Sequence, residues 1–396
     1  MKTPLPIYAL ALTSFALGTA EFAPNGQLLS ASGELGVSVA DAGLITTSFA
    51  LGATIGGPLL AAATLRVPHK RLVLALASVF FLSNIVTAIA PTLALAVGSR
   101  AIAGAMLGAF LGVAVTIASD LVPLARRGGA IALVFLGFTV ANVLGVVAGN
   151  LAGGVWGWRS VFWLVSGLSV LAIVGLASVL PQQQPGPRAT PSAGLAALRT
   201  GRLWLTYAAI ALGYGGLFVM FTYIAPILEE RTGVAPAAVV WILLIFGVGL
   251  VIGTFFAGRA ADRSIRATTI SALALLIVAL IAFWLLDTSL AAVIVLLFLV
   301  GGAGFGLVPP LQSFVLEIAK TTSPVISALA AAAFNAGVAV GSALGGELIR
   351  RGAGYDALPL AGAGLSALGL VVFVIAAGLQ TRSLKKSVST PEPQFA

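Results

Sequence analysis

The chain contains no cysteine and only one histidine among its 396 residues. Without cysteine it can form no disulfide, no thiolate metal site and no cysteine nucleophile. The histidine, His69, lies in the basic stretch 66–71, where a solvated loop residue is favoured over a metal ligand. We therefore expect neither a metal site nor a bound cofactor.

Charge is also scarce, since charged residues make up 8% of the chain and hydrophobic residues 59%, with a mean hydropathy of +1.10. A soluble domain of this length does not have such a composition, so we expect a polytopic helical membrane protein in a lipid bilayer. The net charge is +9. Because the basic residues fall in short gaps between apolar runs, they indicate membrane topology and not a nucleic-acid partner.

Twelve apolar segments are long enough to cross a bilayer as helices. The sequence therefore predicts an all-α membrane protein with twelve transmembrane helices. The expected spans are 6–29, 41–63, 72–90, 93–118, 129–151, 160–180, 203–228, 237–258, 268–286, 289–314, 324–348 and 357–380.

The basic residues indicate the orientation of these spans. If the N-terminus is inside, 16 of the 21 Lys and Arg residues lie in inside segments, four lie outside, and Arg100 lies within a span. This asymmetry predicts a multi-pass protein of the bacterial inner membrane with both termini in the cytoplasm. All six tryptophans fall near predicted helix ends, as in an interfacial belt.

The chain is expected to consist of two six-helix halves. The polar, Pro- and Gln-rich segment 181–202 predicts a cytoplasmic linker between an N-terminal half, 1–180, and a C-terminal half, 203–396. The halves repeat each other: 51–71 is similar to 248–268 at an offset of 197, and the glycine pattern of the fifth span returns in the eleventh at 196. A third match aligns Glu21 with Tyr223. Repeated halves are typical of secondary transporters with a site between the halves.

Glu21 is the most unusual residue of the first span, since a carboxylate at membrane depth costs about 2.5–3.5 kcal/mol on insertion scales. Such a group normally faces a polar cavity and is a candidate functional site. The alternatives are that Glu21 pairs with another helix or reaches the interface, or that the stretch around Gly18 is a signal peptide.

Three motifs carry a resemblance to a known family. Gly258, Asp262 and Arg263 form a loop motif after the eighth span, Arg100 lies in the segment SRAIAGAMLGA, and the fifth span contains glycines four apart in GFTVANVLG. Over essentially its full length, the chain resembles the major facilitator superfamily in its twelve-span drug:proton antiporter branch. This resemblance implies the major facilitator fold and transport in place of enzymatic activity.

The resemblance also implies roles for the motif residues. The loop motif would gate the cytoplasmic side; its first copy keeps Arg66 but has Leu65 in place of the family's acid, and Asp120 could partner Arg66. Arg100 matches a segment that is thought to serve proton transfer, although anchoring backbone carbonyls is an equal alternative. Gly145 and Gly341, on the glycine faces of the fifth and eleventh spans, would support the movement of the helices.

The segments GTAEF, LGVS and TYIAP look most like those of bacterial sugar-efflux and chloramphenicol-exporter proteins. Export of small, largely lipophilic molecules or of sugars is therefore expected, from a mainly apolar pocket with few polar groups. For the aromatic candidates, helix packing is an equal alternative. The candidate substrate-binding residues are Asn25, Asn142, Tyr214, Phe218, Tyr223, Phe246, Gln312 and Asn335.

The expected mechanism is alternating access driven by protons. Deprotonated Glu21 would favour the inward-facing state and help to admit substrate, and reprotonation from outside would expel the substrate. An uncoupled facilitator or importer with the same fold is the main alternative, and a membrane-embedded enzyme or receptor is a weaker one. We expect a monomer whose partners are the substrate and protons. Near the outer end of the eleventh span, Glu347 is expected to pair with Arg350 and Arg351.

Overall fold

The computed structural model describes residues 4–64, 67–123, 126–181, 200–319 and 324–389. Within these ranges every regular element is a helix, and twelve helical segments are long and apolar enough to cross a membrane. The predicted all-α, twelve-span fold is confirmed. Most of the predicted linker, 182–199, and the gating candidate Arg66 with its neighbour Leu65 lie outside the described residues, so the boundaries of the halves stay a prediction.

The first six spans contain several breaks in the α-helical pattern. Their elements are α1 (Leu5–Phe22), η1 (Ala23–Gln27), α2 (Leu28–Leu35), α3 (Val39–Ala42), α4 (Leu44–Leu51), η2 (Gly52–Gly56), α5 (Gly57–Ala63), α6 (His69–Ile89), α7 (Leu93–Asp120), α8 (Arg127–Val140), η4 (Ala141–Gly145), α9 (Val146–Trp156) and α10 (Arg159–Val179). Here η1 is a 3₁₀ turn that begins next to Pro24, while η2 and η4 are π-helical turns. Such π turns occur often at functional sites.

The last six spans are more regular. Their elements are α12 (Gly201–Phe221), α13 (Ile224–Glu230), α14 (Pro236–Arg263), α15 (Ile265–Leu286), α16 (Leu290–Phe305), α17 (Val308–Ala319), α18 (Pro324–Arg350) and α19 (Ala357–Ser389). The positions equivalent to the two π turns lie inside the continuous helices α14 and α18.

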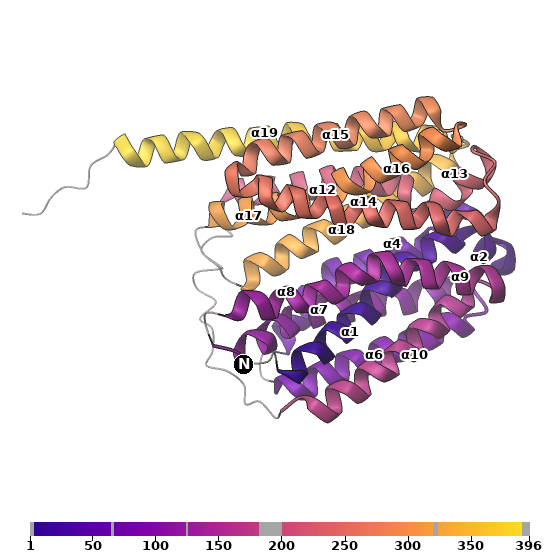
Figure 1. Ribbon diagram of the computed structural model, residues 1–396, viewed down its shortest axis with the longest axis horizontal. Coiled ribbons are helices and arrows are strands. Elements are labelled where there is room, and N and C mark those ends of the chain that lie inside the picture. The colour runs from indigo at the N-terminus through magenta and orange to yellow at the C-terminus, as the bar shows by residue number, and fades with distance from the viewer. Residues whose placement is uncertain (1–3, 65–66, 124–125, 182–199, 320–323, 390–396) are drawn as a thin grey trace, which may run out of the picture.

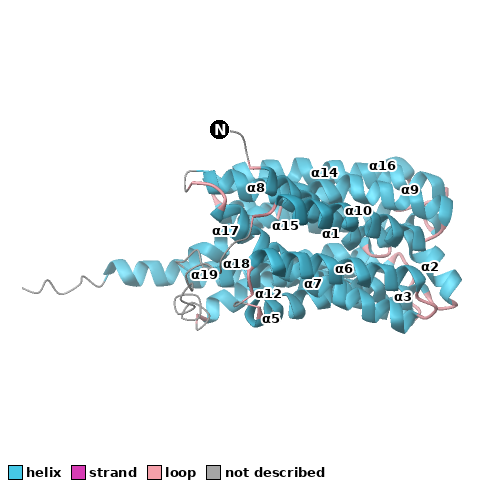
Figure 2. Cartoon of the chain, turned by 90° about the horizontal axis from the view of Figure 1, so that it is seen from below, coloured by secondary structure: helices cyan, strands magenta, loops and turns pink. Residues whose placement is uncertain are grey.

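The two groups of spans lie side by side, the first in indigo to magenta and the second in rose to yellow (Figure 1). The start of α1, the end of α10 and the start of α12 lie at one end of the bundle, which we call the terminal face. The helices α2, α9 and α13 lie at the opposite end, the distal face. Figure 2 shows the long helices running between these two faces, with α19 extending beyond the terminal face.

Glycine contacts confirm that the second and fourth spans of each half pack alike. A Cβ atom on Gly52 would lie 1.9 Å from the carbonyl oxygen of Ala101, and a Cβ atom on Gly249 would lie 2.2 Å from that of Phe298. Both members of the second pair follow the first by 197 positions. The repeat that the sequence indicates is therefore also a repeat of helix–helix contacts.

The fifth and eleventh spans repeat in the same way. A Cβ atom on Gly145 would lie 2.2 Å from the Thr19 hydroxyl oxygen, and a Cβ atom on Gly341 would lie 2.2 Å from the carbonyl oxygen of Gly215. Both residues of the second pair follow their counterparts in the first pair by 196 positions. These two glycines, predicted to support gating, are thus positions where neighbouring helices approach too closely for any side chain.

The predicted match between Glu21 and Tyr223 is wrong. The contacts of the first span recur in the seventh span 196 positions later in the chain. The position equivalent to Glu21 is therefore Leu217, and Phe22 is equivalent to Phe218. The sequence match relied on a shared Ala-Pro pair and ignored helix packing. Consequently the carboxylate of the first span has an apolar equivalent in the second half.

Two other expectations concern the ends of the helices. Glu347 pairs with Arg350 at 2.9 Å and with Arg351 at 2.7 Å, so the expected ion pair is confirmed. Five tryptophans are exposed, but Trp158 is 1% exposed and packs edge-on against Phe162. The interfacial belt of tryptophans therefore does not include Trp158, because the turn before α10 directs the Trp158 side chain into the interior of the first half.

Candidate functional site

Glu21 lies in the last turn of α1, just before the helix tightens into η1. Its side chain is 5% exposed, and its Oε2 atom accepts no hydrogen bond. A buried polar atom without a partner costs about 1–3 kcal/mol, and more when it is charged. A carboxyl group in this position is suited to holding a proton or to meeting a donor group of a ligand.

Arg100, on α7, is fully buried beside the same turn. Its Nη2 donates to the carbonyl oxygen of Ala20 at 2.8 Å, and its Nε donates to that of Ile45 at 3.4 Å. The guanidinium carbon lies 4.1 Å from the centre of the Phe49 ring. Arg100 therefore holds α1 and α4 together through their backbones.

No ion pair within 4.0 Å joins Arg100 to Glu21, although the two charges are close enough to interact electrostatically. Of the two roles that the sequence left open for Arg100, its contacts match the anchoring of carbonyl groups, and a role in proton transfer stays a prediction. The Nη1 atom of Arg100 has no hydrogen-bond partner.

Seven aromatic rings form a continuous cluster next to Glu21, and only one of them comes from the first half. Phe22 stacks on Phe218 with ring centres 5.5 Å apart, so two residues at equivalent positions of the repeat meet between the halves. We call the whole set the aromatic cluster. Its members are Phe22, Tyr214, Phe218, Phe221, Phe246, Phe305 and Phe334.

The aromatic cluster contains three of the predicted substrate-binding residues. Tyr214 lies 5.1 Å from Phe218 and 5.5 Å from Phe305, and Phe246 lies 6.2 Å from Phe305, between ring centres. Every ring of the cluster is at least nine-tenths buried. The structure thus brings Tyr214, Phe218 and Phe246 together in an apolar wall beside the carboxyl group.

The four predicted amides lie on different elements. Asn25 in η1 accepts a hydrogen bond from Thr46 at 2.7 Å, while its Nδ2 has no partner. Asn142 in η4 and Asn335 in α18 each have a buried Oδ1 without a partner. Gln312 in α17 is half-buried. Three amides therefore retain buried polar atoms that could bind a ligand.

Tyr223, which was also predicted to bind substrate, lies apart from the aromatic cluster. It is 1% exposed, follows α12 towards the distal face, and donates its hydroxyl to the carbonyl oxygen of Ser342 at 3.0 Å. The structure therefore places it in a contact between helices.

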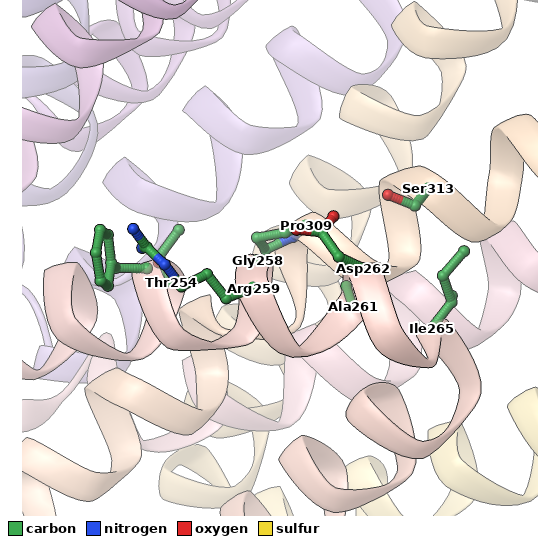
Figure 3. Close-up of a pocket in the computed structure, with 9 residues that line it drawn as sticks. Thr254, Gly258, Arg259, Ala261, Asp262, Ile265, Pro309 and Ser313 are labelled. Atoms are coloured by element: carbon green, nitrogen blue, oxygen red, sulfur yellow. The ribbon is translucent and has the colours of Figure 1, made fainter.

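The second copy of the loop motif borders an open pocket of about 690 Å³ at the terminal end of α14 and α17. Gly258 and Asp262 line it together with Ser313, as Figure 3 shows. Arg263 follows at the exposed end of α14. Asp120, in the first half, is exposed at the end of α7.

Several residues with clear roles in this region were not predicted. Phe22 could have been found from the repeat, because it is equivalent to Phe218. Phe305 and Phe334 lack any local signal, since apolar aromatic residues are common in membrane spans. Arg266 belongs to the predicted loop motif, but its partner does not: it joins α15 to α17 through Glu317 at 3.7 Å, a contact that depends on helix packing.

Comparison with known proteins agrees with this geometry. The family model described as "Major Facilitator Superfamily" matches residues 10–327 and 220–395. The chain is 33% identical to the inner membrane transport protein YdhP of Escherichia coli over 97% of the chain and 99% of that protein. It is 34% identical to a chloramphenicol resistance protein of Streptomyces lividans over 85% of the chain and 87% of that protein.

A solved structure has the same fold. The crystal structure of a bacterial homologue of the human lysosomal transporter Spinster, in an inward-facing and unoccupied conformation, matches with a TM-score of 0.75. The match covers 98% of this chain and 99% of that one at 19% identity. At this identity the likeness concerns the fold alone.

Proposed function

Because the chain belongs to the major facilitator superfamily, whose matched members are transporters and not enzymes, we propose that it is a proton-coupled exporter of small, largely lipophilic molecules. The observation that carries this proposal is the buried carboxyl group of Glu21, which has no hydrogen-bond partner at Oε2 and lies near both Arg100 and Tyr214 of the aromatic cluster. The proposal includes a location in the inner membrane with both termini in the cytoplasm, and a monomeric state.

In the proposed cycle, Glu21 exchanges a proton with whichever side is open. In the inward-facing state it releases the proton to the cytoplasm, and the aromatic cluster with nearby amides receives the substrate. In the outward-facing state a proton from outside returns to Glu21 and the substrate leaves. Each proton that crosses about 100 mV contributes about 2.3 kcal/mol from the potential alone.

Arg100 supports this cycle in two ways. Its guanidinium group places a positive charge near the carboxyl group of Glu21. Its hydrogen bonds to the carbonyl oxygens of Ala20 and Ile45 keep the turn that carries Glu21 in place. Asp262, Gly258 and Arg263 are proposed to gate the terminal face at the pocket of Figure 3.

The decisive experiment is transport in proteoliposomes with an imposed pH gradient. Chloramphenicol is the first probe, because a relative is a chloramphenicol resistance protein. Glu21→Gln should abolish pH-driven accumulation while probe binding stays measurable. Glu230→Gln is the matched control, since Glu230 is exposed near the distal face and should leave accumulation unchanged.

The alternative, an uncoupled facilitator or importer, predicts a different result. Its transport rate would stay the same when the pH gradient is dissipated, and Glu21→Gln would transport like the parent chain. Sugars form the second probe class, because the segments around Glu21 also resemble sugar exporters. Unchanged coupling in Glu21→Gln would remove this residue from the mechanism.

A further inference from the structure

The two halves touch closely near the distal face, where the start of α4 meets the last turns of α18. The hydroxyl oxygens of Thr47 and Ser342 lie 2.7 Å apart, both are buried, and this hydrogen bond joins the first half to the second. The Tyr223 hydroxyl donates to the carbonyl oxygen of Ser342 at 3.0 Å. The Ser342 hydroxyl thus bonds to Thr47 of the first half and, at 3.2 Å, to the carbonyl oxygen of Ala339 in its own half, while its backbone carbonyl accepts from Tyr223.

The glycines around Tyr223 make this contact possible. A Cβ atom on Gly43 would lie 2.2 Å from the Tyr223 hydroxyl oxygen, and one on Gly346 would lie 2.6 Å from it. A Cβ atom on Gly345 would lie 2.7 Å from the Tyr223 ring. Glycines from both halves thus form a slot that fits the ring of Tyr223 only while the halves are together.

An ionic contact follows at the rim. Arg350 Nη1 lies 3.4 Å from Asp41 Oδ1 across the halves, and both side chains are more than a third exposed. Exposed ion pairs of this kind contribute little to stability. The buried hydroxyl pair and the Tyr223 slot therefore dominate the contact.

Thr47 is positioned by the same residues that surround Glu21. Arg100 holds the carbonyl oxygens of Ala20 and Ile45, which immediately precede Glu21 and Thr46. Thr46 in turn donates to Asn25 at 2.7 Å. The start of α4 is thus fixed to the turn of α1 that carries the buried carboxyl group.

We propose that Thr47, Ser342 and Tyr223 form a latch that keeps the distal end of the two halves closed in the state seen here. This rests on the proposed function, in which the distal end must open to release substrate. The three residues are positioning residues for the movement and do not touch the proton. Opening requires that the Thr47–Ser342 hydrogen bond breaks and that Gly43 of the first half moves away from Tyr223.

The absence of cysteine allows a direct test, in which Ala50→Cys serves as the single reporter. Ala50 is 1% exposed on α4 and belongs to the apolar cluster formed mainly by the second half. A membrane-impermeant maleimide added only on the distal side reaches this cysteine when the latch opens. The labelling rate is then proportional to the fraction of molecules whose distal end is open, even when that fraction is small. The measurement needs neither substrate nor a pH gradient.

Loss of the latch should accelerate labelling. Thr47→Val removes the buried hydrogen bond that joins the two halves and should raise the rate about fivefold, the factor expected for a bond that contributes about 1 kcal/mol. Thr47→Ser keeps the hydroxyl and should label at the parent rate. Ser342→Ala is a second variant that should behave as Thr47→Val.

The matched control is Thr87→Val. Thr87 and Ser99 form a buried hydroxyl pair with the same 2.7 Å separation, but both lie in the first half. Loss of the Thr87–Ser99 hydrogen bond should leave the labelling rate unchanged. Equal rates in the parent, Thr47→Val and Ser342→Ala would overturn the latch, as would an equal acceleration by Thr87→Val. Accelerated labelling without pH-driven transport would instead support the latch and contradict proton coupling.

Discussion

At the scale of single residues, the central feature is a polar centre built from very few groups in an apolar interior. Arg100 donates hydrogen bonds to the backbone carbonyl oxygens of Ala20 and Ile45, next to the turn that carries Glu21. Phe49 and Phe162 cover the guanidinium group at 4.1 and 5.5 Å from their ring centres. A planar, multiply donating side chain suits this position better than a point charge does.

We therefore expect Arg100→Lys to destabilise the protein, although it conserves the charge. A lysine ammonium cannot reproduce the fork that bridges α1 and α4, and hydrogen bonds of charged groups contribute about 1.5–3 kcal/mol. The thermal midpoint in detergent should fall measurably. The control is Arg259→Lys, where the exposed guanidinium lies 3.6 Å from the Phe255 ring centre and a small change is expected. Equal midpoints for both variants would show that the carbonyl contacts of Arg100 add no stability.

At the scale of elements, close glycine contacts determine how the helices of each half pack. The α4–η2 segment approaches α7 at Gly52, and α14 approaches α16 at Gly249. Lipid is as apolar as a helix surface, so helices in a membrane associate through close packing and not through the hydrophobic effect. The glycines are thus the sequence feature that specifies the pairing of the helices.

The expected consequence is that Gly52→Ala and Gly249→Ala destabilise the protein to a similar extent. A Cβ atom at either position meets a backbone carbonyl oxygen, which cannot move as a side chain can, and overpacking costs about 1–3 kcal/mol. Gly112→Ala in α7 is the control, because a Cβ atom there meets open space and alanine favours a helix by about 0.5–1 kcal/mol. Thermal unfolding of the three variants would check this, and a stable Gly52→Ala variant would contradict the packing.

At the scale of the whole molecule, the two halves meet closely near the distal face, where the hydroxyl groups of Thr47 and Ser342 form a hydrogen bond across them. The pocket at the terminal end of α14 and α17 is lined by residues of the second half. We expect the terminal face to be cytoplasmic. The excess of basic residues in the segments on that side predicts this orientation.

Single cysteines test this orientation. Ala260→Cys lies at the terminal end of α14 and Gly33→Cys lies in α2 near the distal face, and both positions are exposed. In intact spheroplasts, an impermeant maleimide should label Gly33→Cys and spare Ala260→Cys, and inside-out vesicles should give the reverse. The opposite pattern would place the termini outside and reverse the proposed direction of transport.

Much of the architecture was predictable because its causes are local. Runs of apolar residues long enough to span a bilayer define the twelve helices, and their number and order follow without any knowledge of packing. The repeat was visible because glycines such as Gly52 and Gly249 stand at constant offsets. Glu21 was identified because a carboxylate within an apolar run is costly wherever that helix packs.

The tertiary structure decided which of these residues meet. The stacking of Phe22 on Phe218, the carbonyl groups that Arg100 holds, and the Thr47–Ser342 pair all join residues that are far apart in the chain. For the same reason the sequence aligned Tyr223 with Glu21, whereas helix packing makes Leu217 the equivalent position. Hydrophobicity along a chain fixes which segments become helices, whereas the rotation and closeness of those helices depend on side-chain fit across the bundle, and that fit determines the site.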